Sequence, residues 1–323
     1  MLMKKIWIIL SVVLITVSAC KKGEKPIILD FDNPGEPIEY TDQMRFAYVD
    51  RTEVGIYNLK SGQLDWKWTA ADSPVLTGYA DYFNNFDEVK PVNKCEDLLV
   101  CSTSGGVAMI HIADKSVKFF ALPMGQPHSI ELLPDGNIVV ATSVANDGNG
   151  NMLKVYKMPT DGDAVFVAEQ TSAVDNYSGH NVVWDSFNDV LWATADNVIK
   201  MYAYDMKAMK LKLYQTIELP SSNAHELFPV YGEEKMWLTT GSSIFKFDIY
   251  SYECTKIAGR YTSNVKCVSS GPSGFPTLII WPQKDYYTDT VLDISGGVHY
   301  TKPDAKFYKA RWMIDNPFSY PKN

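Results

Sequence analysis

Apolar and polar residues alternate in short runs along most of the chain from residue 44 onward, and helical periodicity is nearly absent. Val, Ile, Tyr, Phe and Trp are frequent in these runs, and a period of two residues is typical of β-strands. One unit recurs: an apolar residue, an aromatic or aliphatic one, a polar residue in most copies, another apolar residue and then a turn. Its third position falls at residues 58, 112, 157, 205, 248 and 293, so the copies are 43 to 54 residues apart. Six copies of roughly this length predict a β-propeller.

A second landmark precedes this unit in most copies. His128, His180 and His225 each open a short apolar strand, and a threonine follows each of them 14 residues later. Asp87 and Lys266 take the same place in the second and sixth copies. The agreement of the two landmarks indicates that each copy is one blade and that its first strand begins at these residues.

The first blade has no opening strand of its own, because nothing similar precedes the run at residues 44–49. Residues 308–313, near the C-terminus, form an apolar strand without a blade. Pairing of this strand with the first blade would close the ring and remove open sheet edges. The sequence therefore predicts an all-β fold, a six-bladed β-propeller of four-stranded blades closed by a C-terminal strand.

The N-terminus has the features of an export signal. Lys4 and Lys5 precede an apolar stretch at residues 6–17, which is too short to cross about 30 Å of hydrocarbon as a helix. Val-Ser-Ala-Cys20 follows and resembles a bacterial lipobox, in which the cysteine is lipidated. We therefore predict a lipoprotein signal peptide at 1–19, a flexible tether at 20–40 and the propeller at 41–323. The protein would be exported and lipid-anchored in the bacterial cell envelope, at the outer membrane, with no other membrane contact.

Composition narrows the choice of partners. The chain has 46% hydrophobic and 13% aromatic residues, a formal net charge of −8 and no basic cluster. Nucleic acid is therefore not an expected partner, because phosphate binding needs concentrated Lys and Arg. We expect a monomer with a small-molecule or glycan ligand. The cysteines Cys95, Cys101, Cys254 and Cys267 form no CxxC motif, and their spacing leaves their disulfide state open.

Four stretches of the chain resemble an uncharacterised family of exported bacterial propeller proteins: residues 128–137, 180–185, 287–290 and 307–312. They are spread over nearly the whole chain after the tether. The resemblance implies a six-bladed propeller and no particular activity. A looser likeness to quinoprotein-type blades, at residues 57–66, is a strand–turn–strand pattern that implies no quinone cofactor.

The first strand of each propeller blade lines the central channel, so the residues that open these strands should meet at one mouth. The expected ring consists of Asp87, His128, His180, His225, Lys266 and Lys309, with Lys90, Glu131, Glu226 and Arg311 behind it. We predict that a ligand is bound by Asp87, Lys90, His128, His180, His225, Lys266, Lys309 and Arg311.

Three of the five histidines fall in this ring, and three hypotheses explain them. In the first, His128, His180 and His225 hold one divalent metal ion, Zn²⁺ or Mn²⁺, with a position left open for water or substrate. In the second, they recognise a carboxylate or a sugar without metal. In the third, they stabilise the packing of the blades. Three-histidine metal sites occur in the propellers of peptide-amidating lyases and oligogalacturonate lyases, but that likeness concerns architecture alone.

We favour, narrowly, the binding of a small carbohydrate or anionic ligand over catalysis, because no residue spacing demands a reaction. The alternative enzyme is a metal-assisted lyase of uronate-containing polysaccharides, with catalytic candidates His180, Glu131, Glu226, Lys309 and Arg311. Glu131 and Glu226 could instead form ion pairs with Lys90, Lys309 or Arg311. A third function is a scaffold for protein interactions.

The remaining motifs carry less weight. His111 holds a position that is aromatic in other copies and is expected to pack within its blade, whereas His299 is expected at the surface. Asp147 and Asn149 share only their composition with a calcium loop, since the spaced acidic ligands and the closing glutamate are missing.

Overall fold

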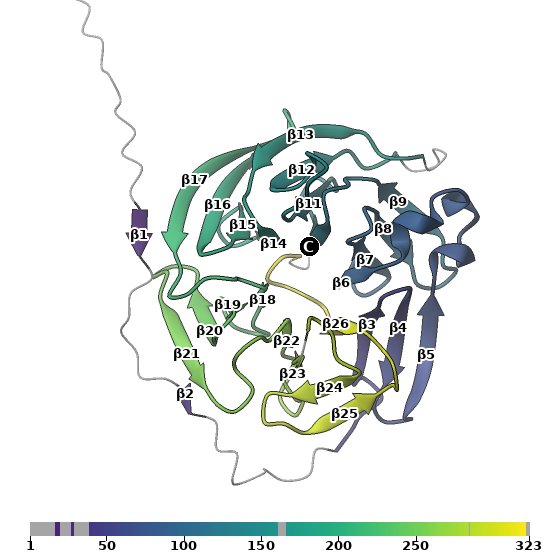
Figure 1. Ribbon diagram of the computed structural model, residues 1–323, viewed down its shortest axis with the longest axis vertical. Helices are drawn as coiled ribbons and strands as arrows, with labels where there is room; N and C mark the ends of the chain where they lie inside the picture. The colour runs from purple at the N-terminus through teal and green to yellow at the C-terminus, as the bar shows by residue number, and fades with distance from the viewer. Residues whose placement is uncertain (1–16, 20–26, 29–38, 161–165, 284, 321–323) are drawn as a thin grey trace, which may run out of the picture.

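The structure is a computed structural model that describes residues 17–19, 27–28, 39–160, 166–283 and 285–320. Six sheets are arranged radially around a central axis, and each contains four antiparallel strands (Figure 1). The predicted six-bladed β-propeller is confirmed. None of the helices among the described residues is long and apolar enough to span a membrane.

Each blade begins with an inner strand at the channel, and its other three strands follow in order towards the outside. Blade 1 contains β26 (Phe307–Trp312), β3 (Arg45–Asp50), β4 (Glu53–Asn58) and β5 (Gln63–Trp68). Blade 2 contains β6 (Phe86–Val92), β7 (Asp97–Ser102), β8 (Val107–His111) and β9 (Val117–Ala121). Blade 3 contains β10 (Pro127–Leu132), β11 (Ile138–Thr142), β12 (Met152–Tyr156) and β13 (Gln170–Asp175).

Blade 4 contains β14 (Gly179–Asp185), β15 (Val190–Ala195), β16 (Val198–Asp205) and β17 (Lys210–Glu218). Blade 5 contains β18 (Glu226–Pro229), β19 (Lys235–Thr239), β20 (Ile244–Asp248) and β21 (Cys254–Ala258). Blade 6 contains β22 (Cys267–Ser269), β23 (Leu278–Ile280), β24 (Thr290–Asp293) and β25 (Val298–Thr301). Blades 1 and 2 are joined through the short 3₁₀ helices η1 (Ala70–Asp72), η2 (Pro74–Leu76) and η3 (Ala80–Phe83).

Two short strands extend the outer edges of neighbouring blades. β1 (Val17–Ala19) pairs in parallel with β17, and β2 (Ile27–Ile28) pairs in parallel with β21. These strands fall in the segments predicted as signal peptide and tether. The remainder of residues 1–38, including the predicted lipidation site Cys20, lies outside the described residues.

The C-terminal strand closes the ring as predicted. β26 pairs antiparallel with β3, and Trp312 lies opposite Phe46 in this ladder. The Trp312 side chain is 2% exposed and packs edge-on against Phe46 and Phe275, at centroid distances of 6.1 and 4.9 Å. Its indole N–H also donates to the carbonyl oxygen of Pro276 at 3.0 Å. These contacts join blade 1 to blade 6, so the last strand of the chain holds the first blade in the ring.

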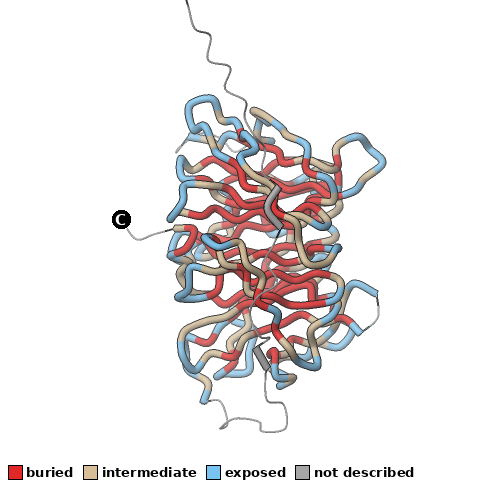
Figure 2. Tube along the Cα trace, turned by 90° about the vertical axis from the view of Figure 1, so that its left-hand side faces the viewer, coloured by how far each residue is buried: buried red, intermediate tan, exposed pale blue. Residues whose placement is uncertain are grey.

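The hydrophobic core is divided into six clusters, and each lies between two neighbouring blades. Figure 2 shows the result from the side: buried strands fill the middle of the molecule, and the exposed residues gather in the turns of the two faces. The sheet of each blade therefore buries both of its faces, one against each neighbouring blade. This explains why the strand sequences contain so many large apolar residues.

Candidate ligand-binding site

The inner strands bring four of the six predicted ring residues together at one mouth of the channel, and irregular pairing helps three of them. Phe86 pairs with Ser102 and Glu88 with Cys101, which leaves Asp87 as an extra residue in β6. Comparable register shifts occur in β10 at His128, in β14 at His180 and in β26 at Lys309. A β-bulge of this kind turns a side chain out of the regular alternation. At Asp87, His128 and His180 the residue at the shift lines the mouth, whereas Lys309 lies in the channel wall beside Glu226.

A cavity of about 550 Å³ opens at this mouth. Four residues of the predicted ring line it: Asp87, His128, His180 and His225. Apart from Val144, the rest of its lining is polar or aromatic and includes Arg51, Asn85, Tyr286, Tyr287 and Tyr308. Its volume is within the range of about 300–1,000 Å³ that is typical of small-molecule sites.

The three histidines lie side by side along the floor of the cavity. The rings of His128 and His180 are stacked, with centroids 4.6 Å apart and planes 17° apart. The rings of His180 and His225 are 4.9 Å apart and tilted by 53°. Residues from three separate blades thus form one continuous imidazole surface, as the spacing of the repeats predicts.

Hydrogen bonds to the backbone fix the proton positions on two of these rings. Nδ1 of His180 lies 3.0 Å from the carbonyl oxygen of Ser178, and Nδ1 of His225 lies 2.7 Å from that of Asn223. A carbonyl oxygen can only accept, so each Nδ1 carries the proton. In the neutral ring the other nitrogen, Nε2, then holds a free lone pair.

Both rings are held in the neutral form. Burial lowers the pKa of His180 well below its usual value, and the neighbouring histidines lower it further. Burial and the charge of Lys266 lower the pKa of His225 to about 3. At neutral pH these two side chains are therefore uncharged hydrogen-bond acceptors at Nε2.

The stacked rings do not present their nitrogens to a common point. The lone pairs of an imidazole lie in the plane of the ring, and the planes of His128 and His180 are almost parallel. Within the part of the chain that the structure describes, no group of three or more His, Cys, Asp or Glu side chains is placed to hold a metal ion. Coordination of one Zn²⁺ or Mn²⁺ by all three histidines would require at least one ring to rotate. The metal site thus stays a prediction.

Asp87 is the buried charged group of the cavity. It is 1% exposed, and its Oδ1 has no hydrogen-bond partner among the described residues. Its Oδ2 lies 3.3 Å from Nδ1 of His128, within ion-pair distance but not aligned as a hydrogen bond. A buried carboxylate oxygen without a partner is costly, by about 1–3 kcal/mol or more. Its position in the cavity lining is therefore the strongest local sign of a ligand.

The predicted residues behind the ring form a buried ion network in the channel wall. Arg311, 0% exposed, binds Glu226 through two hydrogen bonds of 2.8 and 2.9 Å and contacts Glu88 at 3.2 Å. Lys309 also donates to Glu226, at 3.1 Å. Burial alone would raise the pKa of Glu226, but Arg311 and Lys309 outweigh it and hold this pKa at about 2.

A second buried pair lies beside this network. Lys90 donates to Glu131 at 3.0 Å and to the carbonyl oxygen of Val182 at 2.6 Å. Four catalytic candidates, Glu131, Glu226, Lys309 and Arg311, are thus engaged with one another or with Lys90, outside the lining of the cavity. Of the predicted catalytic residues, only His180 faces the cavity.

Lys266 has an intermediate position. It is 2% exposed, and burial followed by the charge of Lys309 lowers its pKa to about 8. Its Nζ lies 5.6 Å from the ring centroid of Tyr286, an aromatic residue of the cavity. Lys266 therefore borders the site without lining it.

Sequence reasoning missed the rim of the cavity. Arg51 donates to Asn85 at 3.0 Å, and Asn85 donates to the hydroxyl of Tyr287 at 3.2 Å. Tyr308 is 4% exposed and lies directly before Lys309 in β26. Tyr308 could have been found from the sequence because it precedes Lys309, a residue of the predicted ring at the channel mouth. Tyr287 could have been found because it lies within a stretch that carried the family resemblance. Arg51 lies in a turn and gave no signal.

The other two histidines lie away from the cavity. His111 contacts Asp97 at 2.8 Å within blade 2, in agreement with the prediction that it packs there. The expected surface position of His299 is wrong: its side chain is 4% exposed, and it contacts Asp293 and the hydroxyl of Tyr40 at 2.8 and 2.7 Å. A tyrosine from outside the repeats covers this ring, which strand alternation does not reveal.

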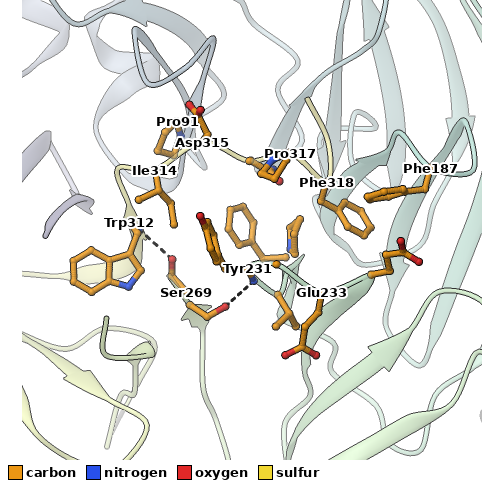
Figure 3. Close-up of a pocket in the computed structure, with 17 residues that line it drawn as sticks. Pro91, Phe187, Tyr231, Glu233, Ser269, Trp312, Ile314, Asp315, Pro317 and Phe318 are labelled. Carbon is orange, nitrogen blue, oxygen red and sulfur yellow. Dashed lines mark hydrogen bonds between the residues drawn. The ribbon is translucent and has the colours of Figure 1, made fainter. Parts of the chain in front are cut away.

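A smaller, mainly apolar pocket of about 200 Å³ lies at the other end of the inner strands (Figure 3). The chain that follows β26 forms one of its walls, with Ile314, Pro317 and Phe318, and Tyr231 borders it from blade 5. Phe318 is anchored where the Ser186 hydroxyl donates to its carbonyl oxygen at 2.6 Å. This pocket contains none of the residues predicted to bind a ligand.

Solved structures support the fold. The β-propeller domain of Cps50 (Swd1) from Myceliophteria thermophila is 10% identical, with 83% of this chain and 85% of that chain covered and a TM-score of 0.54. A chain of the nidogen/laminin complex is 10% identical over 83% and 97%, with a TM-score of 0.55. A chain of the mitotic checkpoint complex is 13% identical over 73% and 68%, with a TM-score of 0.50. Identities this low show the fold alone.

No curated protein matches the chain. A family model described as a family of unknown function (DUF6528) matches residues 2–323.

Proposed function

We propose that this chain, which belongs to the family of unknown function DUF6528, is a cell-envelope lipoprotein that binds a small carbohydrate or anionic ligand in the histidine-lined cavity. The observation that carries the proposal is the buried oxygen of Asp87, which has no partner in the described part of the chain and lies next to imidazoles with free lone pairs. Groups of this kind are rarely left unsatisfied unless a ligand or water completes them. The part of the proposal that concerns export and anchoring rests on the N-terminal sequence.

Binding is favoured over catalysis because the candidate acids and bases are poorly suited to proton transfer. Glu226 is held ionised by Arg311 and Lys309, and a carboxylate with a pKa of about 2 is a weak base. His225, with a pKa of about 3, is also a weak base at neutral pH. Glu131, whose pKa is raised by burial, is paired with Lys90 outside the cavity lining, so the lyase hypothesis would depend on His180, whose pKa is lowered as well.

The test is a thermal-shift screen of the purified chain against neutral sugars, uronates, amines and dicarboxylates, followed by calorimetry of each hit. A ligand at ten times its Kd should stabilise the protein by about 1.4 kcal/mol, or about 3 °C in Tm. His180→Phe should abolish the shift, because it removes an acceptor from the centre of the floor. Asp205→Asn, at an exposed position of β16, is the matched control and should bind normally. A complete screen without a hit would refute the proposal.

The same preparation tests the three alternative predictions: the metal site, the lyase and the scaffold. Binding of Zn²⁺ or Mn²⁺ that raises Tm and is lost in His180→Phe would favour the metal site. An increase in ultraviolet absorbance on a uronate-containing polysaccharide, lost in His180→Ala, would favour the lyase. Binding of a protein, but of no small ligand, at the rim of the cavity would favour the hypothesis of a scaffold for protein interactions.

A further inference from the structure

The floor of the cavity offers hydrogen-bond acceptors and few donors. Oδ1 of Asp87 has no partner among the residues that the structure describes, and the carboxylate cannot donate. His180 and His225 donate through Nδ1 to backbone carbonyls, so only their Nε2 lone pairs remain. A ligand that satisfies this floor must itself bring several N–H or O–H groups.

We propose that the ligand is a neutral sugar whose adjacent hydroxyls donate to Asp87 and to the imidazole nitrogens at the floor of the cavity. This inference rests on the binding function proposed above and chooses between its two ligand classes. Adjacent hydroxyls suit the floor because each can donate to one acceptor while its oxygen still accepts from the rim. The rim supplies donors for that purpose, in Arg51 and the tyrosine hydroxyls.

Charge argues against the ionic alternatives. The carboxylate of a uronate at the floor would meet the carboxylate of Asp87 in a site of reduced polarity, where like charges repel strongly. An ammonium group would be attracted by Asp87 but opposed by Lys266, whose charge already lowers the pKa of His225. A polyol carries neither penalty, so the uncharged donor is the best match.

The walls of the cavity suit a sugar ring. Tyr287 and Tyr308 lie with their ring centroids 5.9 Å apart at an angle of 57°, and Tyr286 is 65% exposed beside them. Aromatic rings of this kind offer an apolar face and a polar edge at once. A sugar ring has the complementary character, with C–H groups on its faces and hydroxyls around its rim. The volume of about 550 Å³ leaves room for one or two such rings.

The decisive experiment compares ligands that differ only in charge. Calorimetry is run with glucose against glucuronate, galactose against galacturonate, and glucose against glucosamine, together with mannose, xylose and the neutral disaccharides. At least one neutral sugar should bind, and its uronate and amino counterparts should bind at least about tenfold more weakly. Tighter binding of a uronate or of glucosamine than of the parent sugar would overturn the inference.

Asp87→Asn separates the role of charge from that of shape. The variant should bind the neutral sugar about five- to a hundredfold more weakly, since an acceptor oxygen is lost. The difference in affinity between the neutral sugar and its uronate should become smaller. Glu96→Gln, at an exposed carboxylate between β6 and β7 that lies outside the cavity lining, is the control and should change neither affinity. Unchanged Tm and circular dichroism show that both variants fold. Full affinity of Asp87→Asn for the neutral sugar would contradict the proposed contact.

The two proposals fail in different ways. Binding of a uronate, an amine or a dicarboxylate that His180→Phe abolishes, without any neutral sugar bound, would overturn the neutral-sugar inference and leave the binding function intact. A screen in which nothing binds to the cavity would overturn both.

Discussion

Arg311→Met should destabilise the protein strongly, because Arg311 is the centre of the ion network in the channel wall. The guanidinium is fully buried and contacts both Glu226 and Glu88. Methionine keeps much of the volume but leaves Glu88 without this ion pair and Glu226 with Lys309 alone. Removal of one partner from a buried pair costs about 3–5 kcal/mol.

The pKa of Glu226 gives a second route to the same magnitude. Its pKa is about 2 in the folded protein against 4.5 for the free side chain, and one pKa unit corresponds to about 1.4 kcal/mol. The ionised form of Glu226 thus contributes about 3 kcal/mol above pH 4.5, and this contribution is lost as the pH falls from 4.5 to 2. Arg311 is a larger cause of this lowering than Lys309, so the pKa supports the estimate of about 3 kcal/mol for Arg311→Met at neutral pH.

The assay is urea unfolding of the wild type and Arg311→Met at pH 7 and at pH 4. In the variant, the carboxylates behind the ring should have raised pKa values, so protonation at pH 4 should relieve part of the cost. The difference between the two proteins should therefore shrink at the lower pH. Arg260→Met, at an exposed arginine, is the control and should change stability by less than about 0.5 kcal/mol. A loss below about 1 kcal/mol for Arg311→Met, or one that does not depend on pH, would refute the reasoning.

Two further changes probe other parts of the molecule. The pKa of His225 is about 3 in the folded protein and 6.5 in the free side chain. Between these pH values only the unfolded chain binds a proton at His225, so the stability present above pH 6.5 is lost as the pH falls towards 3. His225→Gln should reduce that acid sensitivity in urea titrations, and an unchanged pH profile would show that His225 is not held neutral. Trp312→Ala should cost about 3–5 kcal/mol in the same assay, because the indole is 2% exposed at the closure of the ring, and a loss below about 1 kcal/mol would mean that β26 does not secure it.

The number of blades and the closure of the ring were accessible from the sequence because they depend on local patterns. Each blade is a run of hairpins, so its strands follow one another along the chain and repeat with nearly constant spacing. The orphan strand at the C-terminus was recognisable because one blade lacked its opening element. The meeting of His128, His180 and His225 followed from the same periodicity, since equivalent positions of radially arranged blades lie near one axis.

The sequence offered the pairing of Glu131 and Glu226 with Lys90, Lys309 or Arg311 only as an alternative to a catalytic role, and the structure shows the pairs Lys90–Glu131, Lys309–Glu226 and Arg311–Glu226. Arg311 and Glu88 are 223 positions apart, and Arg311 and Glu226 are 85 apart. The repeats place all three on inner strands, but not the direction in which each side chain turns. Only the packed channel shows that these groups neutralise one another in the wall, whereas Asp87 turns to the mouth at a bulge.

The sequence by itself determined the class of fold, the six blades, the closing strand and the gathering of histidines at one mouth, because alternation and repeat spacing are properties of neighbouring residues. The tertiary structure decided which ionisable groups face the cavity and which form ion pairs in the channel wall. It also decided how the imidazoles stack and which turn residues form the rim. These features depend on distances between side chains from different blades and on how deeply each is buried, and neither quantity is encoded in the local pattern.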